Sequence, residues 1–327
     1  SKQLGEALAP MDIVQPDLAA QALAFVEQAE NVGLLQSLST LPKAKDFSDL
    51  LGKPGRLRWQ FNAWNNKPVE NAGKKSLNAR SAFYASIEAD KPPLDALVRL
   101  GKILAAADNG SSLEPTGAPG PQWLHYLLND AWFSSFNEKM STAEASKKRP
   151  AWGIDLVAKI LLHEELDPML ALQIIFERKE LDSYYHDHLG SFVLMPAVAD
   201  FMRAHPEAVA KLPAQLSASG RVLLAERLGR DKALLNDFPA LLVALAADGS
   251  KTVRAESAPH LEGIAQERRL PLLAELLRSG DSTQRAQAAD LLARYPAENT
   301  RQVLSDALEA ETSKPVQQAL RTALSRL

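Results

Sequence analysis

The stretch that decides the fold lies near the C-terminus and runs Asp248-Gly249-Ser250-Lys251-Thr252-Val253-Arg254-Ala255. Two related stretches follow it, Gly280-Asp281-Ser282-Thr283-Gln284-Arg285-Ala286 and Thr312-Ser313-Lys314-Pro315-Val316-Gln317-Gln318. Each is a polar turn that leads into a helix of small and apolar residues. Arg285 follows Arg254 by 31 residues, and Leu324 follows Leu292 by 32. This period predicts pairs of short helices, which cannot bury both apolar faces alone and therefore stack on their neighbours.

A weaker copy of the pattern, Ser219-Gly220-Arg221-Val222-Leu223-Leu224-Ala225-Glu226-Arg227-Leu228, lies about one period before the first. The pattern resembles the HEAT-repeat family, and especially its phycobilisome-lyase-like variety, in which an acidic or glycine turn precedes Val-Arg and a small-residue helix. The resemblance is clear over 248–327 and extends back to about 206. It implies a right-handed α/α superhelix that binds partners on its concave face.

Arg254 and Arg285 occupy the same position in two successive copies. We favour the interpretation that they form a structural ladder with turn carboxylates of adjacent repeats. The alternative is that both arginines bind a ligand on the concave face. Gln317 takes this position in the third copy, which argues against a continuous basic stripe.

Helical spacing dominates the rest of the chain, and no sustained alternation of apolar and polar residues predicts strands. Several expected helices begin just after proline, where a missing N–H costs little; they follow Pro93, Pro121, Pro150 and Pro168. The predicted fold class is therefore all-α, a HEAT-like α/α superhelix with a less regular N-terminal helical region. The expected organisation is an irregular helical region over 1–109, a loop over 110–121, degenerate helical repeats over 122–205, and HEAT-like repeats over 206–327.

Composition excludes several classes of protein. The 327 residues include no cysteine, so disulfide scaffolds, thiol nucleophiles and cysteine-based zinc sites are excluded. The longest apolar run, 240–247, is far too short to cross a bilayer. The polar start, Ser1-Lys2-Gln3, is not a signal peptide, so we expect a cytoplasmic protein without membrane partners.

The net charge of −3 conceals a basic segment over 53–80, which holds seven basic residues and one acidic residue. Aromatic side chains are interleaved with the charges. Basic groups neutralise phosphates and aromatic rings stack on bases, so the segment suits nucleic acid. The alternative is that the tryptophans anchor a helical core and the charges are solvated. The candidate nucleic-acid-binding residues are Arg56, Arg58, Trp59, Trp64, Lys67, Lys74, Lys75 and Arg80.

Catalytic and metal-binding signatures are weak throughout. The histidines of His163-Glu164-Glu165 and Tyr184-Tyr185-His186-Asp187-His188 lack helical metal-ligand spacing, so we expect no metal or other cofactor. Some HEAT-like proteins are DNA glycosylases that use aromatic residues and a carboxylate. Trp123, Trp132 and Trp152 with Asp130 or Asp155 could be assigned to those roles, but each lies on an apolar helical stripe, and packing explains them more simply.

The sequence thus predicts a non-enzymatic scaffold that binds a protein partner or another domain of its own parent chain. The alternative is a nucleic-acid-binding protein, including a HEAT-like DNA glycosylase. The missing initial methionine and the apolar stripe that runs to Leu327 are typical of a fragment of a longer protein. The helical texture is also similar to parts of large bacterial molybdate-metabolism-regulator-like proteins that contain WGR domains, although no WGR signature occurs here.

Overall fold

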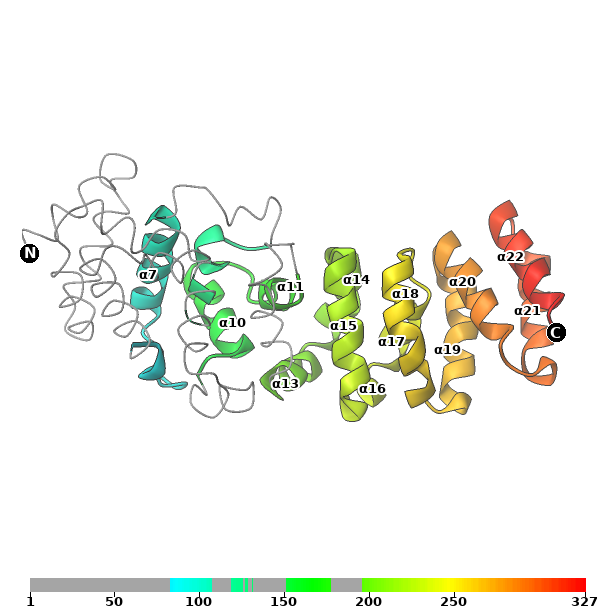
Figure 1. Cartoon of the computed structure of the whole chain (residues 1–327), viewed down its shortest axis with the longest axis horizontal. Helices are drawn as coiled ribbons and strands as arrows, with labels where there is room; N and C mark the ends of the chain where they lie inside the picture. The colour runs from blue at the N-terminus through cyan, green and yellow to red at the C-terminus, as the bar shows by residue number, and fades with distance from the viewer. Residues whose placement is uncertain (1–82, 108–118, 126, 129–130, 132–150, 178–195) are drawn as a thin grey trace, which may run out of the picture. The chain divides into compact units, whose positions relative to one another are not determined.

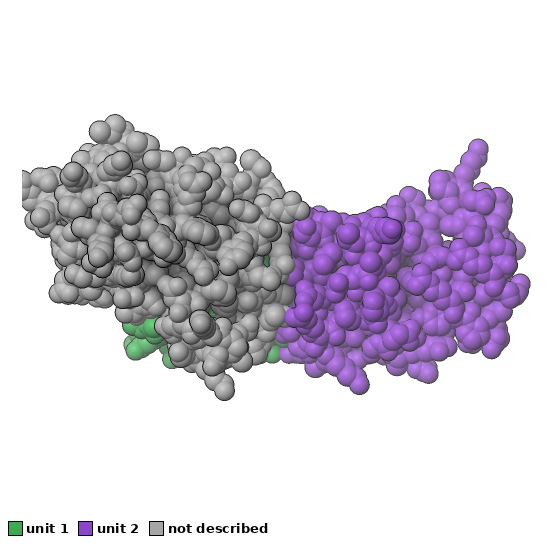
Figure 2. Space-filling model, viewed as in Figure 1, with its two compact units in different colours: residues 1–175, 179–201 green, residues 176–178, 202–327 purple. Residues whose placement is uncertain are grey.

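The computed structural model of the chain describes residues 83–107, 119–125, 127–128, 131, 151–177 and 196–327. Within these ranges all regular structure is helical and no strand occurs, which confirms the all-α prediction. The chain divides into two compact units, coloured separately in Figure 2. Unit 1 comprises 1–175 and 179–201, and unit 2 comprises 176–178 and 202–327.

The described part of unit 1 is organised around a buried aromatic pair. Four helices with defined bounds begin in it, α7 (Leu94–Ala107), α10 (Ile154–His163), α11 (Leu170–Phe176) and α13 (Pro196–Ala204), and residues 83–85, 122–125, 127–128 and 131 are also helical. The rings of Tyr84 and Trp152 meet edge to face with their centroids 5.2 Å apart. The indole N–H of Trp152 donates to the backbone carbonyl of Tyr84 at 2.9 Å. Residues 68 apart in the chain are thereby fixed together.

The helix expected after Pro150 begins only at Ile154. Gly153 is its N-cap and is fully extended, with φ −172° and ψ −173°. Trp152 therefore lies before the helix, and its indole is directed into the core instead of following the helical stripe. The expected start of this helix was wrong because the tertiary contact of Trp152 overrides local helical spacing.

Unit 2 is a row of paired helices (Figure 1). We call α15, α18, α20 and α22 the B layer, and α17, α19 and α21 the A layer. Helix α15 packs on α18 and α20 on α22, while α17, α19 and α21 pack along the A layer. The helices of unit 2 that follow α13 are α14 (Pro206–Gln215), α15 (Ala218–Arg230), α16 (Lys232–Asp237), α17 (Pro239–Ala246), α18 (Lys251–Ser257), α19 (Gln266–Ser279), α20 (Ser282–Leu292), α21 (Ala297–Ala310) and α22 (Lys314–Leu324).

The interior between the two layers is built from leucine, valine and alanine. Leu242, Leu273, Leu304 and Leu320 are fully buried. Because short helices bury these side chains only by stacking, the repeat period in the sequence becomes a period in the packing.

The helix of the first repeat is shorter than its sequence pattern indicates. Helix α18 ends at Ser257, and the chain continues as a 3-10 helix, η2 (Ala258–Gly263). Pro259 lacks the N–H that an α-helix would need at this position. The 3-10 turn brings the His260 ring against α15 at Gly229, where a Cβ atom would lie 2.3 Å from the ring.

No helix in the described part of the chain combines the length and apolar character that a membrane span requires.

Candidate functional site

Each B-layer helix of unit 2 begins after a short polar turn, and the turn fixes one side chain in the same place in every repeat. Before α15, Ser217 Oγ accepts a hydrogen bond from the Gly220 N–H at 3.2 Å. Before α20, Asp281 and Gln284 form a reciprocal capping box at 2.9 and 3.0 Å. The residue four positions after each N-cap defines what we call the ladder slot, which holds Arg221, Arg254, Arg285 and Gln317.

Arg285 shows how a ladder slot joins two repeats. Its Nη1 donates to the carbonyl of Gly280 in its own turn at 2.7 Å. Its Nε and Nη2 donate to the two carboxylate oxygens of Glu311, in the next turn, at 2.8 and 3.2 Å. We call the edge formed by Nε and Nη2 the side edge of the guanidinium. A planar carboxylate matches this edge because both groups present two atoms at the same spacing.

Arg221 repeats this arrangement one junction earlier. Its Nη1 donates to the carbonyl of Leu216 at 2.7 Å. On its side edge, Nε lies 2.7 Å from Asp248 Oδ2, and Nη2 donates to Oδ1 at 3.1 Å. The Arg221 and Asp248 side chains are 21% and 13% exposed, so water screens this pair less than a fully exposed one.

Arg254 lies between these two and differs from both. Its Nη1 donates to the carbonyls of Asp248 and Gly249 at 2.6 and 2.9 Å, so the guanidinium is anchored on its own turn. Within the described part of the chain, neither Nε nor Nη2 of Arg254 has a partner. Arg254 as a whole is partly exposed.

The reason for the open edge is one residue in the following turn. We call a junction closed when the arginine in its ladder slot meets a carboxylate of the next turn, and we call that pair a rung. At both closed junctions the carboxylate belongs to the residue six positions before the next ladder slot, which is Asp248 or Glu311. At the junction after Arg254 this residue is Ser279. Ser279 has no charge, and its hydroxyl donates to the Glu275 carbonyl at 2.9 Å. Asp281 is close in sequence, but its carboxylate caps α20.

Helix packing is interrupted at the same junction. In the B layer, α15 packs on α18 and α20 packs on α22, whereas α18 and α20 scarcely touch. The repeats on either side are joined through α17 and α19 in the A layer. The two turns still meet, because a Cβ on Gly249 would lie 3.9 Å from the methyl group of Thr283. The open guanidinium edge and the gap in B-layer packing therefore coincide.

The charges at the closed C-terminal junction are electrostatically satisfied. The hydrogen bond from Arg285 is the main cause that holds the pKa of Glu311 below its usual value, and the backbone N–H of Ser313 adds to it. Partial burial would raise the pKa of Asp290, but its hydrogen bonds with Arg326 and Arg294 outweigh burial and lower it. Both carboxylates are therefore ionised and paired at neutral pH.

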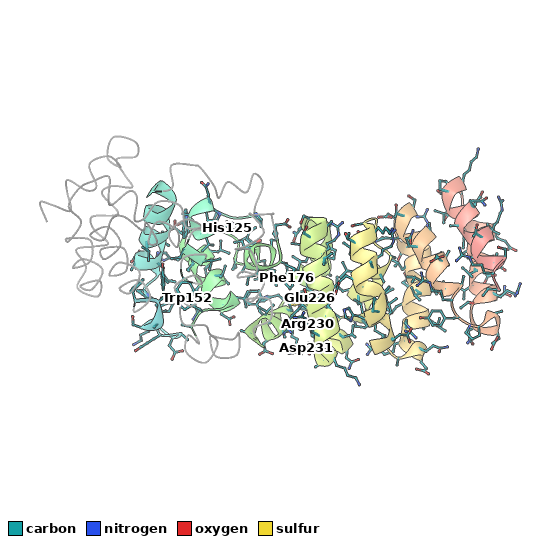
Figure 3. All side chains as sticks on the ribbon, in the orientation of Figure 1. His125, Trp152, Phe176, Glu226, Arg230 and Asp231 are labelled. Carbon is teal, nitrogen blue, oxygen red and sulfur yellow. The ribbon has the colours of Figure 1, made fainter. Side chains whose placement is uncertain are left out.

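Several other ion pairs in unit 2 join residues of one helix or its cap, whereas Arg203 Nε on α13 donates to Asp237 Oδ2 on α16 at 2.7 Å. Near the C-terminal end of α15, Arg230 pairs with Glu226 (Figure 3). Arg227 Nη2 lies 3.3 Å from Asp231 Oδ2. Arg230 is 55% exposed, and exposed pairs of this kind contribute little free energy. The two pairs at the end of α15 span one turn of chain and do not connect repeats.

The buried Arg269 holds α19 of the A layer against neighbouring segments. Its Nη1 donates to the carbonyl of Leu261 at 2.8 Å and lies 2.8 Å from Glu262 Oε1. Its guanidinium lies 5.0 Å from the centre of the Tyr295 ring. These contacts tie α19 to the preceding 3-10 helix and to the loop before α21, which indicates a structural role.

The structure thus separates the two arginines that the sequence singled out. The ladder interpretation is confirmed for Arg285, whose carboxylate partner belongs to the adjacent repeat. For Arg254 the ladder interpretation was wrong, because among the described residues its guanidinium donates to the carbonyls of its own turn and meets no carboxylate of an adjacent repeat. A ligand-binding role for either arginine stays a prediction. The basic segment 53–80 lies outside the described residues.

The other candidate positions are only partly described. Trp152 is 5% exposed and its N–H is engaged by Tyr84, as the packing interpretation expects. His163 Nε2 lies 3.1 Å from Asp95 Oδ1. Among the side chains that the structure places, no three metal-ligating groups lie together. Residues Asp130, Trp132 and 184–188 lie outside the described ranges.

Sequence reasoning missed Arg221, Asp248 and Glu311 as members of the ladder. The signal was present, because each of the three lies at a fixed distance from a predicted turn. Aligning the copies on their N-caps, instead of on their leucines, would have found them.

Residues 238–325 match the family of HEAT repeats, which confirms the HEAT-like prediction over that segment. No curated protein and no solved structure matches the chain. The finer similarities, to the phycobilisome-lyase-like variety and to WGR-containing proteins, stay predictions.

Proposed function

We propose that this chain is a non-enzymatic scaffold that binds another protein through the B layer of unit 2. The match of 238–325 to HEAT repeats carries the proposal, because such repeats are typical of protein-interaction scaffolds. Stacked repeats present a continuous surface across several helices, and such a surface binds a partner without a catalytic pocket.

The surface chemistry of the B layer supports the same function. Its solvent-facing positions carry small and polar side chains, including Lys251, Thr252, Ala255, Gln318 and Thr322. A surface of this kind remains hydrated when free and forms hydrogen bonds with a bound partner, which suits a transient interaction.

Cross-linking of the purified complex tests the proposal. The full chain is purified with its partner at high salt and treated with an amine-reactive cross-linker. Lys251 and Lys314 are exposed on the B layer, whereas Lys211 and Lys232 are exposed on helices outside it and serve as matched controls. We expect cross-links to the partner at Lys251 and Lys314. Cross-links confined to Lys211 and Lys232 would contradict the proposal.

A second candidate is nucleic-acid binding through 53–80, which rests on the excess of six positive charges and the interleaved aromatic residues in that segment. It predicts a salt-dependent mobility shift with DNA or RNA that is lost when Arg56→Glu and Lys74→Glu are combined. A shift that persists in this variant would assign the binding to another part of the chain.

A further inference from the structure

We propose that Arg254 receives a carboxylate from the bound protein, so that an Asp or Glu side chain of the partner completes the ladder at the junction of α18 and α20. This inference rests on the proposed scaffold function and specifies the chemistry that the partner must bring. The occupant is an acidic peptide segment.

The closed junctions define what the open one lacks. At Arg221 and Arg285, Nη1 is held by a carbonyl of the same turn while the side edge holds a carboxylate. At Arg254 the first half of this arrangement is complete, with Nη1 anchored at 2.6 and 2.9 Å. The side edge is therefore oriented before any ligand arrives, which lowers the conformational entropy lost on binding.

The junction also leaves the partner room to approach. Helices α18 and α20 scarcely touch, so the seam between them is more loosely packed than the seams between α15 and α18 or between α20 and α22. Lys251, at the first position of α18, is exposed and adds a second positive charge on the same helix. Asp281 and Asp248 do not compensate Arg254, because Asp281 caps α20 and Asp248 pairs with Arg221.

The precedent within the chain favours a carboxylate as the ligand; a phosphate also binds an arginine fork through two oxygens, so the oligothymidylate comparison below separates the two. At Arg285 the side edge holds a planar carboxylate with one hydrogen bond from each nitrogen, and at Arg221 Nη2 donates to one oxygen of Asp248 while Nε lies 2.7 Å from the other. The same edge of Arg254 offers this fork to the partner, and fork-to-fork pairing gives planar recognition as well as charge.

An oligoglutamate peptide is titrated into the full chain, and NMR spectra monitor the side-chain Nε–H resonances of the arginines. We expect the peptide to shift the Arg254 resonance and to leave that of Arg285 in place, because Glu311 already fills the edge of Arg285. Losing one charged hydrogen-bonded pair weakens binding by about ten- to a hundredfold, so Arg254→Gln is expected to raise the dissociation constant by that factor.

The Arg254→Gln variant is expected to fold, because another repeat already has glutamine in this slot. Gln317 occupies the equivalent slot and donates from Nε2 to the Glu311 carbonyl at 2.6 Å, so glutamine can make the turn anchor. Ser279→Glu is a second variant, which places an acid where the closed junctions have one. It keeps Arg254 but occupies its side edge with a carboxylate of the chain itself, and it is expected to raise the dissociation constant of the peptide by a similar factor.

Controls separate this site from general charge attraction. Arg301 is exposed on α21, so Arg301→Gln removes one positive charge elsewhere on unit 2 and is expected to leave the dissociation constant unchanged. An oligoglutamine peptide of equal length is expected not to bind. Equal losses in Arg254→Gln and Arg301→Gln, full binding by Ser279→Glu, or an oligothymidylate of equal charge that shifts the Arg254 resonance as strongly as oligoglutamate does would each overturn the inference.

The failure of this inference differs from the failure of the scaffold proposal. A partner that still cross-links to Lys251 and Lys314 in Arg254→Gln with unchanged affinity would refute the role of Arg254 and leave the scaffold intact. A partner that avoids both lysines would refute the scaffold itself.

Discussion

The rung between Arg285 and Glu311 provides the sharpest test of the ladder. The Glu311 side chain is 9% exposed and accepts four hydrogen bonds. Two come from Arg285, and two come from the backbone N–H groups of Thr312 and Ser313 at 2.9 and 2.8 Å. Glu311→Ala removes all four acceptors at once. The turn amides can find water, but the half-buried guanidinium loses its charge partner, so we expect a loss of about 2–3 kcal/mol.

Glu311→Gln is the finer perturbation, because it keeps one acceptor oxygen and removes the charge. We expect it to cost about 1–2 kcal/mol. Combined with Arg285→Gln it should cost less than the sum of the two single changes, with a coupling energy of about 1 kcal/mol or more. Glu309, exposed on α21 and without a hydrogen bond or ion pair in the described structure, is the matched control, and Glu309→Gln should stay within about 0.5 kcal/mol.

Hydrogen exchange followed by mass spectrometry is the suitable assay. The chain contains two compact units, so a single unfolding midpoint need not report on one junction. Exchange in peptides that cover α21 and α22 reports the local free energy of opening there. Equal effects of Glu311→Gln and Glu309→Gln, or additive effects of Glu311→Gln and Arg285→Gln, would refute the ladder as a source of stability.

The same rung predicts a dependence on pH. The folded pKa of Glu311 is below its usual value of 4.5, chiefly because Arg285 donates to the ionised carboxylate. The unfolded chain therefore binds this proton more readily, and the rung stabilises the fold fully above about pH 4.5. That stability is lost as the pH falls through the lower folded pKa. Glu311→Gln should remove this part of the acid sensitivity of α21 and α22.

Three further predictions concern a close helix contact, a buried tryptophan and a buried histidine. Gly229→Ala should destabilise unit 2 by about 1–3 kcal/mol, because the new Cβ overlaps the His260 ring; in a His260→Ala background the change should become stabilising by up to about 1 kcal/mol, since alanine is the better helix former. Urea denaturation of the four variants checks the reversal of sign. Trp152→Phe should destabilise unit 1 by about 2–3 kcal/mol, because the buried carbonyl of Tyr84 loses its donor and the core loses volume; near-ultraviolet circular dichroism during denaturation would show it, and an unchanged midpoint would contradict it. Burial lowers the pKa of His125 despite its hydrogen bond to a backbone carbonyl, so unit 1 should lose stability as the pH falls below about 6.5, the ordinary pKa of the ring; His125→Gln should flatten that dependence in exchange measurements between pH 7 and about pH 5.5.

The parts of the fold that the sequence predicted are those fixed by local chemistry. The turn before Arg285 recurs because a cap, a helix start and a small-residue stripe must follow one another at fixed spacing. Such spacing is visible in a single chain. The start of α10 was not, because Trp152 is withdrawn from the helix by a carbonyl 68 residues away.

The open rung at Arg254 was hidden for a different reason. In the sequence, Arg254 lies six residues after Asp248 and 27 residues before Asp281, and either could be its partner. The structure shows that Asp248 belongs to Arg221 and that Asp281 belongs to the cap of α20. Which acid meets which arginine depends on how the helices stack, and periodicity alone does not determine that pairing.

An open rung between two closed ones also has an energetic meaning. A single change at Ser279 would supply an acid, and a half-buried pair at the closed junctions shows that the geometry accommodates one. The chain forgoes this interaction at the junction where α18 and α20 are not packed together. Proteins commonly leave such stability unused at positions that must bind or move. If the acid arrives on a partner, binding fills the open edge of Arg254, so the bound partner should stabilise the turn that holds Arg254.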